Sequence, residues 1–479
     1  MVRHIGLEPT RLASPDPKSG AATNYANAAR ILIIIQLTIF YLQLTDCEQK
    51  KTGKRISDCK SSANISNVQM KKENISYHEL ENGIKIVHRK TQSPVSWLGL
   101  MVNAGTRDEQ KALNGMAHYI EHTVFKGTES RTAKQIINRI EDIGGEINAY
   151  TTKEETTFYA AVPTHYYGRA LELIADMVFN PSFPEEETDK ELGVILDEIE
   201  SYEDSPSELI YDDFESLIFS GHPLEMPILG TRRSLKHINK AQTIRFMQEN
   251  YHTEGMVFFS MSSLPMSKVT AMAEQYLSEC RYKRVRAHTR TQPLNIKAED
   301  AYYHRHTHQT HVMLGGRAYK LGHERQPALY LLNNMLGGGS MNSRLNMSLR
   351  EQRGLVYTIE STYTPLSDTG YWCIYFASEP QNAEQCEQLV RDELKRMTDS
   401  KLSDYALRKA IRQLRGQLTI SSENQENYAL RMAKLMLHQG AAPDWKETFA
   451  TIEQLTPEIL LETAQEIFGR GEICAMRYI

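Results

Sequence analysis

Hydrophobic and polar positions follow a regular pattern from about residue 75 to the end of the chain. In the first part of this region, alternation of apolar and polar residues is typical of strands, and Asn82-Gly83 predicts a hairpin turn. Apolar residues three and four positions apart predict helices instead. The pattern predicts a strand hairpin at 77–88, strands at 95–102, 146–150 and 159–163, and helices at 115–125, 133–143, 166–178 and 185–202.

A similar order of elements recurs in the second half, which predicts an internal duplication. We expect an α+β fold of two similar domains, each a mostly antiparallel sheet with flanking helices. The domains span 75–280 and 298–479, and the basic, proline-containing segment 281–297 links them. In the second domain, strands are predicted at 311–316 and 371–376, and helices at 328–336, 383–397 and 404–419.

Residues 1–74 form a polar N-terminal extension outside this pattern. The extension contains a short hydrophobic segment, 31–44, whose 14 residues fall short of the roughly 20 that a spanning helix needs. We interpret this segment as the core of a signal peptide or as an N-terminal membrane anchor, and the alternative is an extension without a targeting role. Two localisations therefore stay open: cytoplasmic, or exported or membrane-anchored.

Composition narrows the class of protein. A chain of 479 residues has room for about two to four domains. Its 24% of charged residues and mean hydropathy of −0.48 are typical of a globular protein and exclude a polytopic membrane protein. The net charge of −5 gives no basic excess, so we expect no nucleic-acid partner. Six scattered cysteines without a CxxC pair exclude a zinc ribbon and a dense disulfide framework.

The segment His118-Tyr119-Ile120-Glu121-His122 carries the strongest chemical signal. In a helix the two histidines are four residues apart, so both imidazoles leave one face and can share a metal ion. Glu121 lies on nearly the same face and can reach a water on that metal. This HxxEH order is the inverse of HExxH. The motif occurs by chance in about 4% of such chains, and the alternative is a polar helix face with two solvated histidines.

A zinc hydrolase needs a third protein ligand and one position open for water. The predicted helix at 185–202 supplies two candidates, Glu191 and Glu198, which are two turns apart and face the same way. The residues by themselves leave the choice between these two glutamates open.

With these residues the chain resembles the pitrilysin/insulinase family of inverzincin peptidases. Glu198 follows His122 by 76 residues within an ExxVIxxE-like helix, as in that family. The resemblance covers about residues 75–479 and is closest to the half-length subfamily that includes mitochondrial processing peptidase and its bacterial relatives. Thr123 departs from the family, which usually has an apolar residue there, but it is not at a ligand position. Other matching segments are 114–118, 125–128, 144–149, 221–224, 228–231 and 336–357.

The resemblance implies one Zn²⁺ per chain, held by His118, His122 and Glu198. It also implies that Glu121 is the general base, which takes a proton from the attacking water and passes it to the leaving amine. Glu191 resembles the acid that supports the ligand set in the family.

The resemblance further implies where a peptide substrate lies. Asn148 and Ala149 match the segment that pairs with the substrate backbone, as in strand addition. Arg350 and Tyr357, in the second half, match a pair of donors at the scissile carbonyl. The alternative for this pair is structural: Arg350 binds a local acid, and Tyr357 fills a core.

We therefore expect a zinc-dependent metalloendopeptidase that hydrolyses unfolded or short peptides held in a clamshell chamber. One chain resembles half of a clamshell and carries both the metal set and the Arg350/Tyr357 pair, so we expect a homodimer. A heterodimer with a related noncatalytic subunit is the alternative assembly. The competing functions are a noncatalytic chamber or scaffold subunit, against which the complete metal motif argues, and a peptide-binding chaperone with incidental zinc.

Overall fold

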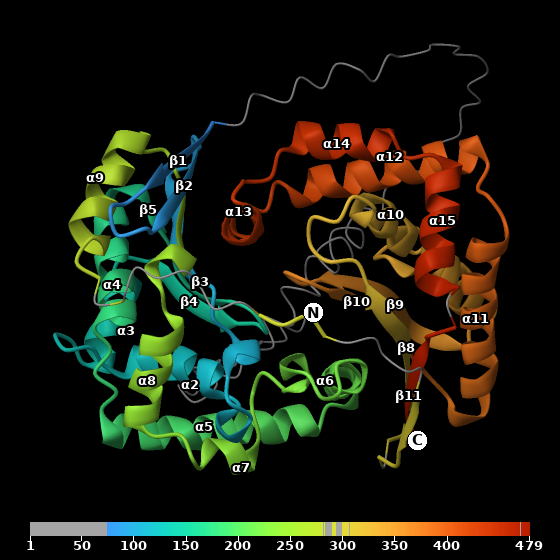
Figure 1. Cartoon of the computed structure of the whole chain (residues 1–479), viewed down its shortest axis with the longest axis horizontal. Helices are drawn as coiled ribbons and strands as arrows, with labels where there is room; N and C mark the ends of the chain where they lie inside the picture. Colours follow the sequence, from blue (N-terminus) through green and yellow to red (C-terminus); the bar gives the residue numbers. More distant parts are fainter. Residues whose placement is uncertain (1–73, 281, 283–289, 294–298, 306, 470) are drawn as a thin grey trace, which may run out of the picture.

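The computed structural model describes residues 74–280, 282, 290–293, 299–305, 307–469 and 471–479 (Figure 1). The hydrophobic segment 31–44 and the rest of the expected extension before residue 74 lie outside these residues, as does most of the expected linker. Within the described part of the chain, no helix is long and apolar enough to cross a membrane.

In the described part of the chain, six strands form the sheet of the first domain. They are Ile75–Glu79 (β1), Lys85–Lys90 (β2), Val95–Val102 (β3), Glu146–Thr151 (β4), Thr156–Pro163 (β5) and Met256–Ser262 (β6). Their order is β1-β2-β6-β3-β5-β4, with β2 and β6 parallel and the other neighbours antiparallel. β4 is therefore an edge strand. The predicted hairpin turns at Gly83, whose φ of 95° favours glycine.

The second sheet repeats this topology. Its strands are Asp300–Tyr303 (β7), Thr310–Ala318 (β8), Val356–Pro365 (β9), Gly370–Ser378 (β10) and Cys474–Tyr478 (β11). The order β7-β11-β8-β10-β9 matches β2-β6-β3-β5-β4 strand for strand, and again the first pair is parallel and the others are antiparallel. This correspondence confirms the predicted α+β duplication.

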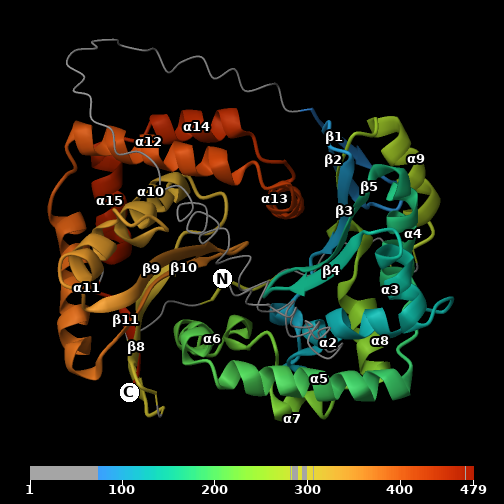
Figure 2. The ribbon, with the colours of Figure 1, turned by 180° about the vertical axis from the view of Figure 1, so that it is seen from behind.

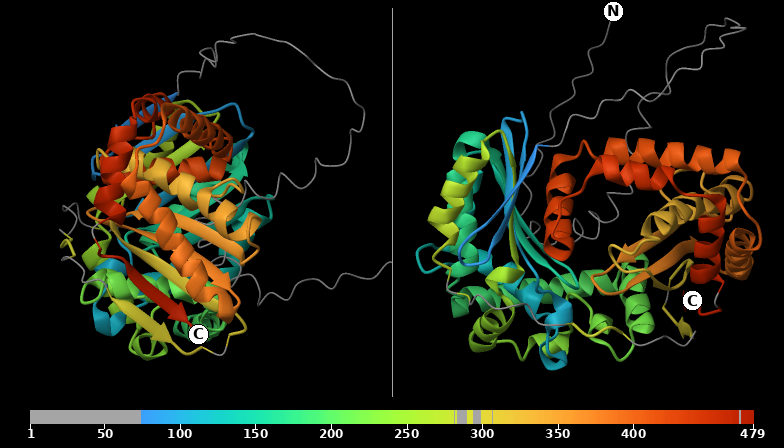
Figure 3. Two further views of the ribbon diagram at one scale, coloured as in Figure 1. Left: turned by 90° about the vertical axis from the view of Figure 1, so that its right-hand side faces the viewer. Right: turned by 45° about the horizontal axis from the view of Figure 1, so that its top comes forward.

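Helices cover the outer face of each sheet (Figures 1 and 3). The first domain has Met116–Thr123 (α2), Ala133–Glu141 (α3), Tyr167–Phe179 (α4), Glu185–Glu203 (α5), Pro206–Ile218 (α6), Arg232–Leu235 (α7), Lys240–Asn250 (α8) and Met266–Leu277 (α9). The second has Gln326–Gly337 (α10), Ala383–Asp399 (α11), Asp404–Ser421 (α12), Gln425–Gln439 (α13), Trp445–Glu453 (α14) and Pro457–Phe468 (α15). α4 and α9 pack on the first sheet, and α10, α11 and α15 pack on the second, with a hydrophobic core between each sheet and its helices.

Each sheet is also covered on its inner face by a helix from the other domain (Figures 1 and 2). α13 packs on β2, β3 and β6, where Met432 shares a buried cluster with Phe259. α6 packs on β8 and β11, and its Phe214 ring lies against Gly315, where a Cβ would be 3.0 Å from Cζ. The two domains of the chain therefore share two further hydrophobic cores.

Candidate metal centre

The two histidines of the HxxEH motif project from one face of α2. Their ring centroids are 4.5 Å apart. His118 is fully buried, and the side chain of His122 is 8% exposed. α2 packs against both α5 and β4, and the imidazoles lie beside Glu198 of α5.

Glu198 reaches the histidines from α5. Its Oε2 atom lies 3.7 Å from Nε2 of His118 and 3.5 Å from Nε2 of His122. The ligand atoms of a tetrahedral zinc ion are about 3.3 Å apart, so a small closing movement brings this group to zinc geometry. Both carboxylate oxygens of Glu198 are buried and accept no hydrogen bond from the residues that the structure describes. Buried polar atoms normally have a partner, so the residues present fit a zinc ion.

The electrostatics of the three side chains also favour a cation. Burial lowers the pKa of His118 well below its ordinary value, so its imidazole is neutral and can act as a ligand. Burial raises the pKa of Glu198 to about 7, and the nearby carboxylates of Glu121 and Glu191 add to the rise. A divalent cation among these groups stabilises the ionised carboxylate and offsets its desolvation.

Glu191 and Lys126 hold the second histidine in place. Oε1 of Glu191 lies 2.9 Å from Nδ1 of His122, and its Oε2 pairs with Nζ of Lys126 at 2.6 Å. Burial by itself would lower the pKa of His122, but this hydrogen bond and the neighbouring carboxylates outweigh burial and raise it. Nδ1 of His122 thus donates to Glu191, which leaves Nε2 to face the metal position. Sequence reasoning did not single out Lys126, although its spacing of four residues from His122 was a signal.

Glu121 lies beside this group in the same helix and is 6% exposed. Burial raises its pKa, while His122 and hydrogen bonds with Thr151 at the end of β4 partly oppose the rise. Oε2 of Glu121 accepts no hydrogen bond from the described residues. A carboxylate with a raised pKa and an available oxygen is suited to take a proton and return it near neutral pH.

The residues expected to pair with substrate lie on β4, next to α2. Asn148 and Ala149 pair with Tyr159 and Phe158 of β5 on one side, and no described strand lies on the other side. The Ala149 side chain belongs to the buried core, so this residue can offer a ligand only its backbone groups. An edge strand presents the N–H and C=O groups that strand addition requires.

Arg350 and Tyr357 lie together in the second domain. Arg350 is in a π-helix, Asn346–Glu351. π-helices are rare in proteins, and those that occur are often found at functional sites. The guanidinium of Arg350 lies 5.5 Å from the centre of the Tyr357 ring and 3.8 Å from the carboxylate of Glu351. Tyr357 is 79% exposed and therefore does not fill a core.

The structure does not bring this pair to the metal-ligating group of its own chain. Tyr357 stands eight residues before Pro365 on β9, which is about 26 Å along the strand. The turn after Pro365 meets the first domain, where Ser367 donates hydrogen bonds to Glu154. Among the described residues, neither Arg350 nor Tyr357 forms a hydrogen bond or ion pair with the group around His118.

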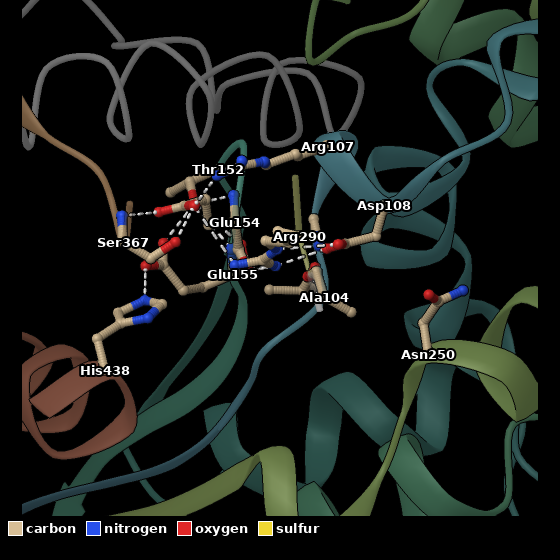
Figure 4. Close-up of polar contacts among 12 residues, drawn as sticks. Ala104, Arg107, Asp108, Thr152, Glu154, Glu155, Asn250, Arg290, Ser367 and His438 are labelled. Carbon is tan, nitrogen blue, oxygen red and sulfur yellow. Dashed lines mark hydrogen bonds and ion pairs between the residues drawn. The ribbon is translucent and has the colours of Figure 1, made fainter. Parts of the chain in front are cut away.

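A second set of possible metal ligands, which sequence reasoning missed, lies between the domains. Glu154, Glu155 and His438 have donor atoms close enough for a metal, but cations of the protein already bind both carboxylates (Figure 4). Arg107 pairs with Glu154 at 2.7 Å, and Lys434 lies 3.1 Å from Glu155. We call this set, with Asp108, Arg290, Ser367 and Asp368, the interdomain cluster, and interpret it as a contact between domains.

Comparison with known proteins matches two family models to this chain. The model for insulinase (peptidase family M16) matches residues 85–232, and the model for the peptidase M16 inactive domain matches residues 237–414. Among solved structures, a protease from Helicobacter pylori has a TM-score of 0.78 at 20% identity, covering 85% of this chain and all of that one. A peptidase M16 inactive domain from Pseudomonas fluorescens gives the same TM-score at 21% identity, with coverage of 85% and 97%. These structures show the fold.

Curated relatives show the family. The "Uncharacterized zinc protease YmxG" of Bacillus subtilis is 30% identical over 404 residues, which are 84% of this chain and 98% of the relative. An uncharacterized zinc protease of Streptomyces coelicolor is 31% identical over 407 residues, covering 82% and 86%. These names support a peptidase function broadly and suggest zinc as the metal. The match over nearly the whole length of such relatives shows that the chain belongs to the insulinase family of peptidases, M16.

Proposed function

We propose that the chain is a zinc-dependent metalloendopeptidase that hydrolyses unfolded or short peptides. The observation that carries this proposal is the convergence of His118, His122 and Glu198 within 4.8 Å, with Glu121 buried beside them. A bound Zn²⁺ would polarise the scissile carbonyl and lower the pKa of a water to about 7. The names of the relatives, which are zinc proteases, support the same metal and reaction.

The protein's own groups move the proton. Oε2 of Glu121 takes a proton from the attacking water and gives it to the leaving amine, which must be protonated to depart. The raised pKa of Glu121 brings its proton affinity nearer to that of the water. His122 keeps one tautomer through both steps because Glu191 accepts from its Nδ1.

The edge of β4 explains why the substrate should be an extended chain. A peptide that adds to this edge forms backbone hydrogen bonds with the strand that carries Asn148 and Ala149. The strand lies against α2, so such a peptide passes beside the metal position. A folded segment has its backbone groups already paired and cannot add in this way.

A homodimer would complete the site with donors from the second copy. Tyr357 is exposed, and within the described residues neither it nor Arg350 forms a hydrogen bond or ion pair with the candidate metal ligands of its own chain. We infer that two copies close a clamshell chamber in which each supplies this pair to the other's scissile carbonyl. A related noncatalytic subunit could supply the same donors in a heterodimer.

The principal test is Glu121→Gln, because an amide cannot accept the water's proton. We expect the variant to keep one zinc per chain while its kcat on a peptide mixture falls by about 10²–10⁴. Glu141→Gln, an exposed carboxylate on α3, is the matched control and should behave as the wild type. A Glu121→Gln variant that keeps more than about a tenth of the wild-type kcat would contradict the proposal.

Mixing two impaired variants tests the dimer. Hybrid dimers of Glu121→Gln with Tyr357→Phe contain one site with an intact Glu121 and the other copy's intact Tyr357. If the pair acts between copies, mixing and re-equilibration should restore up to about a quarter of wild-type activity. No recovery, with hybrid dimers shown to form, would place Tyr357 outside the partner's site.

A further inference from the structure

Helix α2 begins without a capping side chain of its own. Its N-cap is Gly115, whose φ of 92° is in the left-handed region and which has no side-chain oxygen for the first-turn N–H groups. Such groups are normally satisfied by Ser, Thr, Asp or Asn at the N-cap. Here the oxygens come from Glu109, six residues earlier in the chain.

Both carboxylate oxygens of Glu109 receive N–H groups from the start of α2. Oε1 accepts from the backbone of Ala117 at 2.8 Å, and Oε2 accepts from the backbone of Gly115 at 2.7 Å. The side-chain amide of Asn114 donates to Oε2 and to the carbonyl of Pro227, each at 2.9 Å. Glu109 is 8% exposed, so protein groups and not bulk water solvate this carboxylate.

Two opposing effects act on the ionisation of Glu109. Burial raises the pKa of this residue to about 8, while the N–H groups of Ala117, Asn114 and Gly115 oppose the rise. Glu109 accepts from three N–H donors, and this set suits a carboxylate better than a protonated carboxyl, whose O–H would itself need an acceptor.

Close backbone packing fixes the position of this turn. A Cβ on Gly115 would lie 2.8 Å from the carbonyl oxygen of Leu229. Gly230, whose φ is 75°, would meet the carbonyl oxygen of Asn114 at 2.5 Å if it carried a Cβ. The start of α2 therefore rests directly on the backbone of residues 229–230.

The segment that carries Glu109 is itself anchored by the interdomain cluster (Figure 4). Arg107 pairs with Glu154 of the first domain at 2.7 Å and with Asp368 of the second at 2.6 Å. Asp108 pairs with Arg290 at 2.6 Å. Glu109 thus extends from a fixed point of the protein to the first turn of the metal-binding helix.

We propose that Glu109 is a positioning residue of the metal centre, which sets the place of α2 and hence of His118. This inference rests on the proposed zinc site. His118 directly follows Ala117, and its Nε2 lies 3.7 Å from Oε2 of Glu198, close to the spacing that zinc requires. If the first turn of α2 is released, the distance between His118 and Glu198 can increase. The metal then has His118 displaced from its ligand position.

Glu109→Gln tests the proposal because the amide has nearly the same size and one end that donates. The NH₂ group of the glutamine faces an N–H donor, so at least one hydrogen bond to the start of α2 is lost. We expect the zinc Kd, measured on the metal-free full chain by competition with a chelator, to rise about 10–100-fold. At saturating Co²⁺ the visible absorption bands should shift, because the ligand geometry changes. Glu109→Asp keeps the charge, and its zinc Kd should lie between the values of Glu109→Gln and the wild type.

Asp176→Asn is the matched control. Asp176 is a carboxylate of the same domain that accepts hydrogen bonds from Thr128, Ser130 and Arg131 and, among the described residues, forms none with α2. Its loss should lower the melting temperature and leave the zinc Kd unchanged. A Glu109→Gln Kd within about twofold of the wild type, or an equal rise in both variants, would overturn the proposal. If Glu109→Gln does not fold, the same criteria apply to Glu109→Asp.

Failure of the proposed function gives a different result. A wild-type chain that binds no zinc contradicts the metal site itself. Amide hydrogen exchange in α2 then still tests Glu109, because it should be faster in Glu109→Gln than in Asp176→Asn without any metal. Equal exchange in α2 of both variants would overturn the positioning role.

Discussion

Replacing Glu191 by alanine should weaken zinc binding without removing a ligand. Oε1 of Glu191 lies 2.9 Å from Nδ1 of His122, and the two side chains are 6% and 8% exposed. In the variant this buried N–H loses its acceptor, which costs about 1–3 kcal/mol. The ring is also free to adopt the tautomer that places its proton on Nε2, the nitrogen that faces the metal position.

The expected magnitude follows from that cost. Since 1.4 kcal/mol is a factor of ten, the zinc Kd should rise by about 5- to 150-fold. Partners that orient a histidine ligand typically contribute 10–100-fold, which agrees. Glu191→Gln separates charge from geometry: its amide oxygen still accepts from Nδ1, so the rise should be at the lower end. Its NH₂ group then faces Lys126, which loses its ion pair.

Competition titration of the metal-free full chain with zinc and a chelator measures the effect. Glu172→Ala is the control, because Glu172 pairs with Arg131 and Arg139 in the same domain and, within the described residues, has no hydrogen bond or ion pair with the candidate ligands. A folded Glu191→Ala variant with the wild-type Kd would refute the reasoning. So would an equal loss of affinity in Glu172→Ala, which would indicate general destabilisation.

Two further predictions concern the second domain and its contact with the first. Tyr357→Phe should keep zinc content and melting temperature near wild type, because the side chain is exposed, while kcat/KM falls about tenfold to a thousandfold; a lowered melting temperature with full activity would contradict this. Burial by itself would raise the pKa of Glu155, but Lys434 and His438 outweigh it and hold the pKa well below 4.5. A lowered folded-state pKa gives stability that is present above the unfolded value of 4.5 and is lost as the pH falls through the folded value. Glu155→Gln should therefore be less stable than the wild type near pH 7, and urea unfolding near pH 3 should show a smaller difference; equal differences would argue against the ion pair.

The two histidines of the candidate metal site could be placed together from the sequence because spacing within a helix determines which side chains share a face, whereas the choice of Glu198 over Glu191 came from the family resemblance. His118 and His122 are one turn apart, and Glu198 lies in a helix whose pattern was regular enough to predict. The predicted helices agree with the structure to within two residues at each end, for the same reason. Local periodicity and capping decide these features, and both are visible along the chain.

The supports of the site could not be predicted in the same way, because they depend on contacts between distant segments. Lys126 reaches Glu191 across the gap between two helices, and Glu109 caps a helix from a loop. Neither contact changes the hydrophobic pattern of its own segment. Where Arg350 and Tyr357 lie relative to the candidate metal ligands likewise depends on how the duplicated domains are placed, which periodicity does not encode.

α6 and α13 each pack on the sheet of the other domain, so the stabilities of the two domains should depend on each other. Phe214→Ala tests this. Phe214 is fully buried on α6, in one cluster with Met313 and Cys373 of the second sheet. Truncation should cost about 3–5 kcal/mol.

Because α6 follows directly after α5, loosening it also releases the end of the helix that carries Glu198. We therefore expect calorimetry of Phe214→Ala to show one transition at a lower temperature, and the zinc Kd to rise with it. Ile137→Ala is the control, because this side chain on α3 is 39% exposed. It should change neither the transition temperature nor the zinc Kd. Two separate transitions, with only the second domain destabilised and zinc affinity intact, would show that the domains are independent units and that α6 does not transmit their contact to the metal centre.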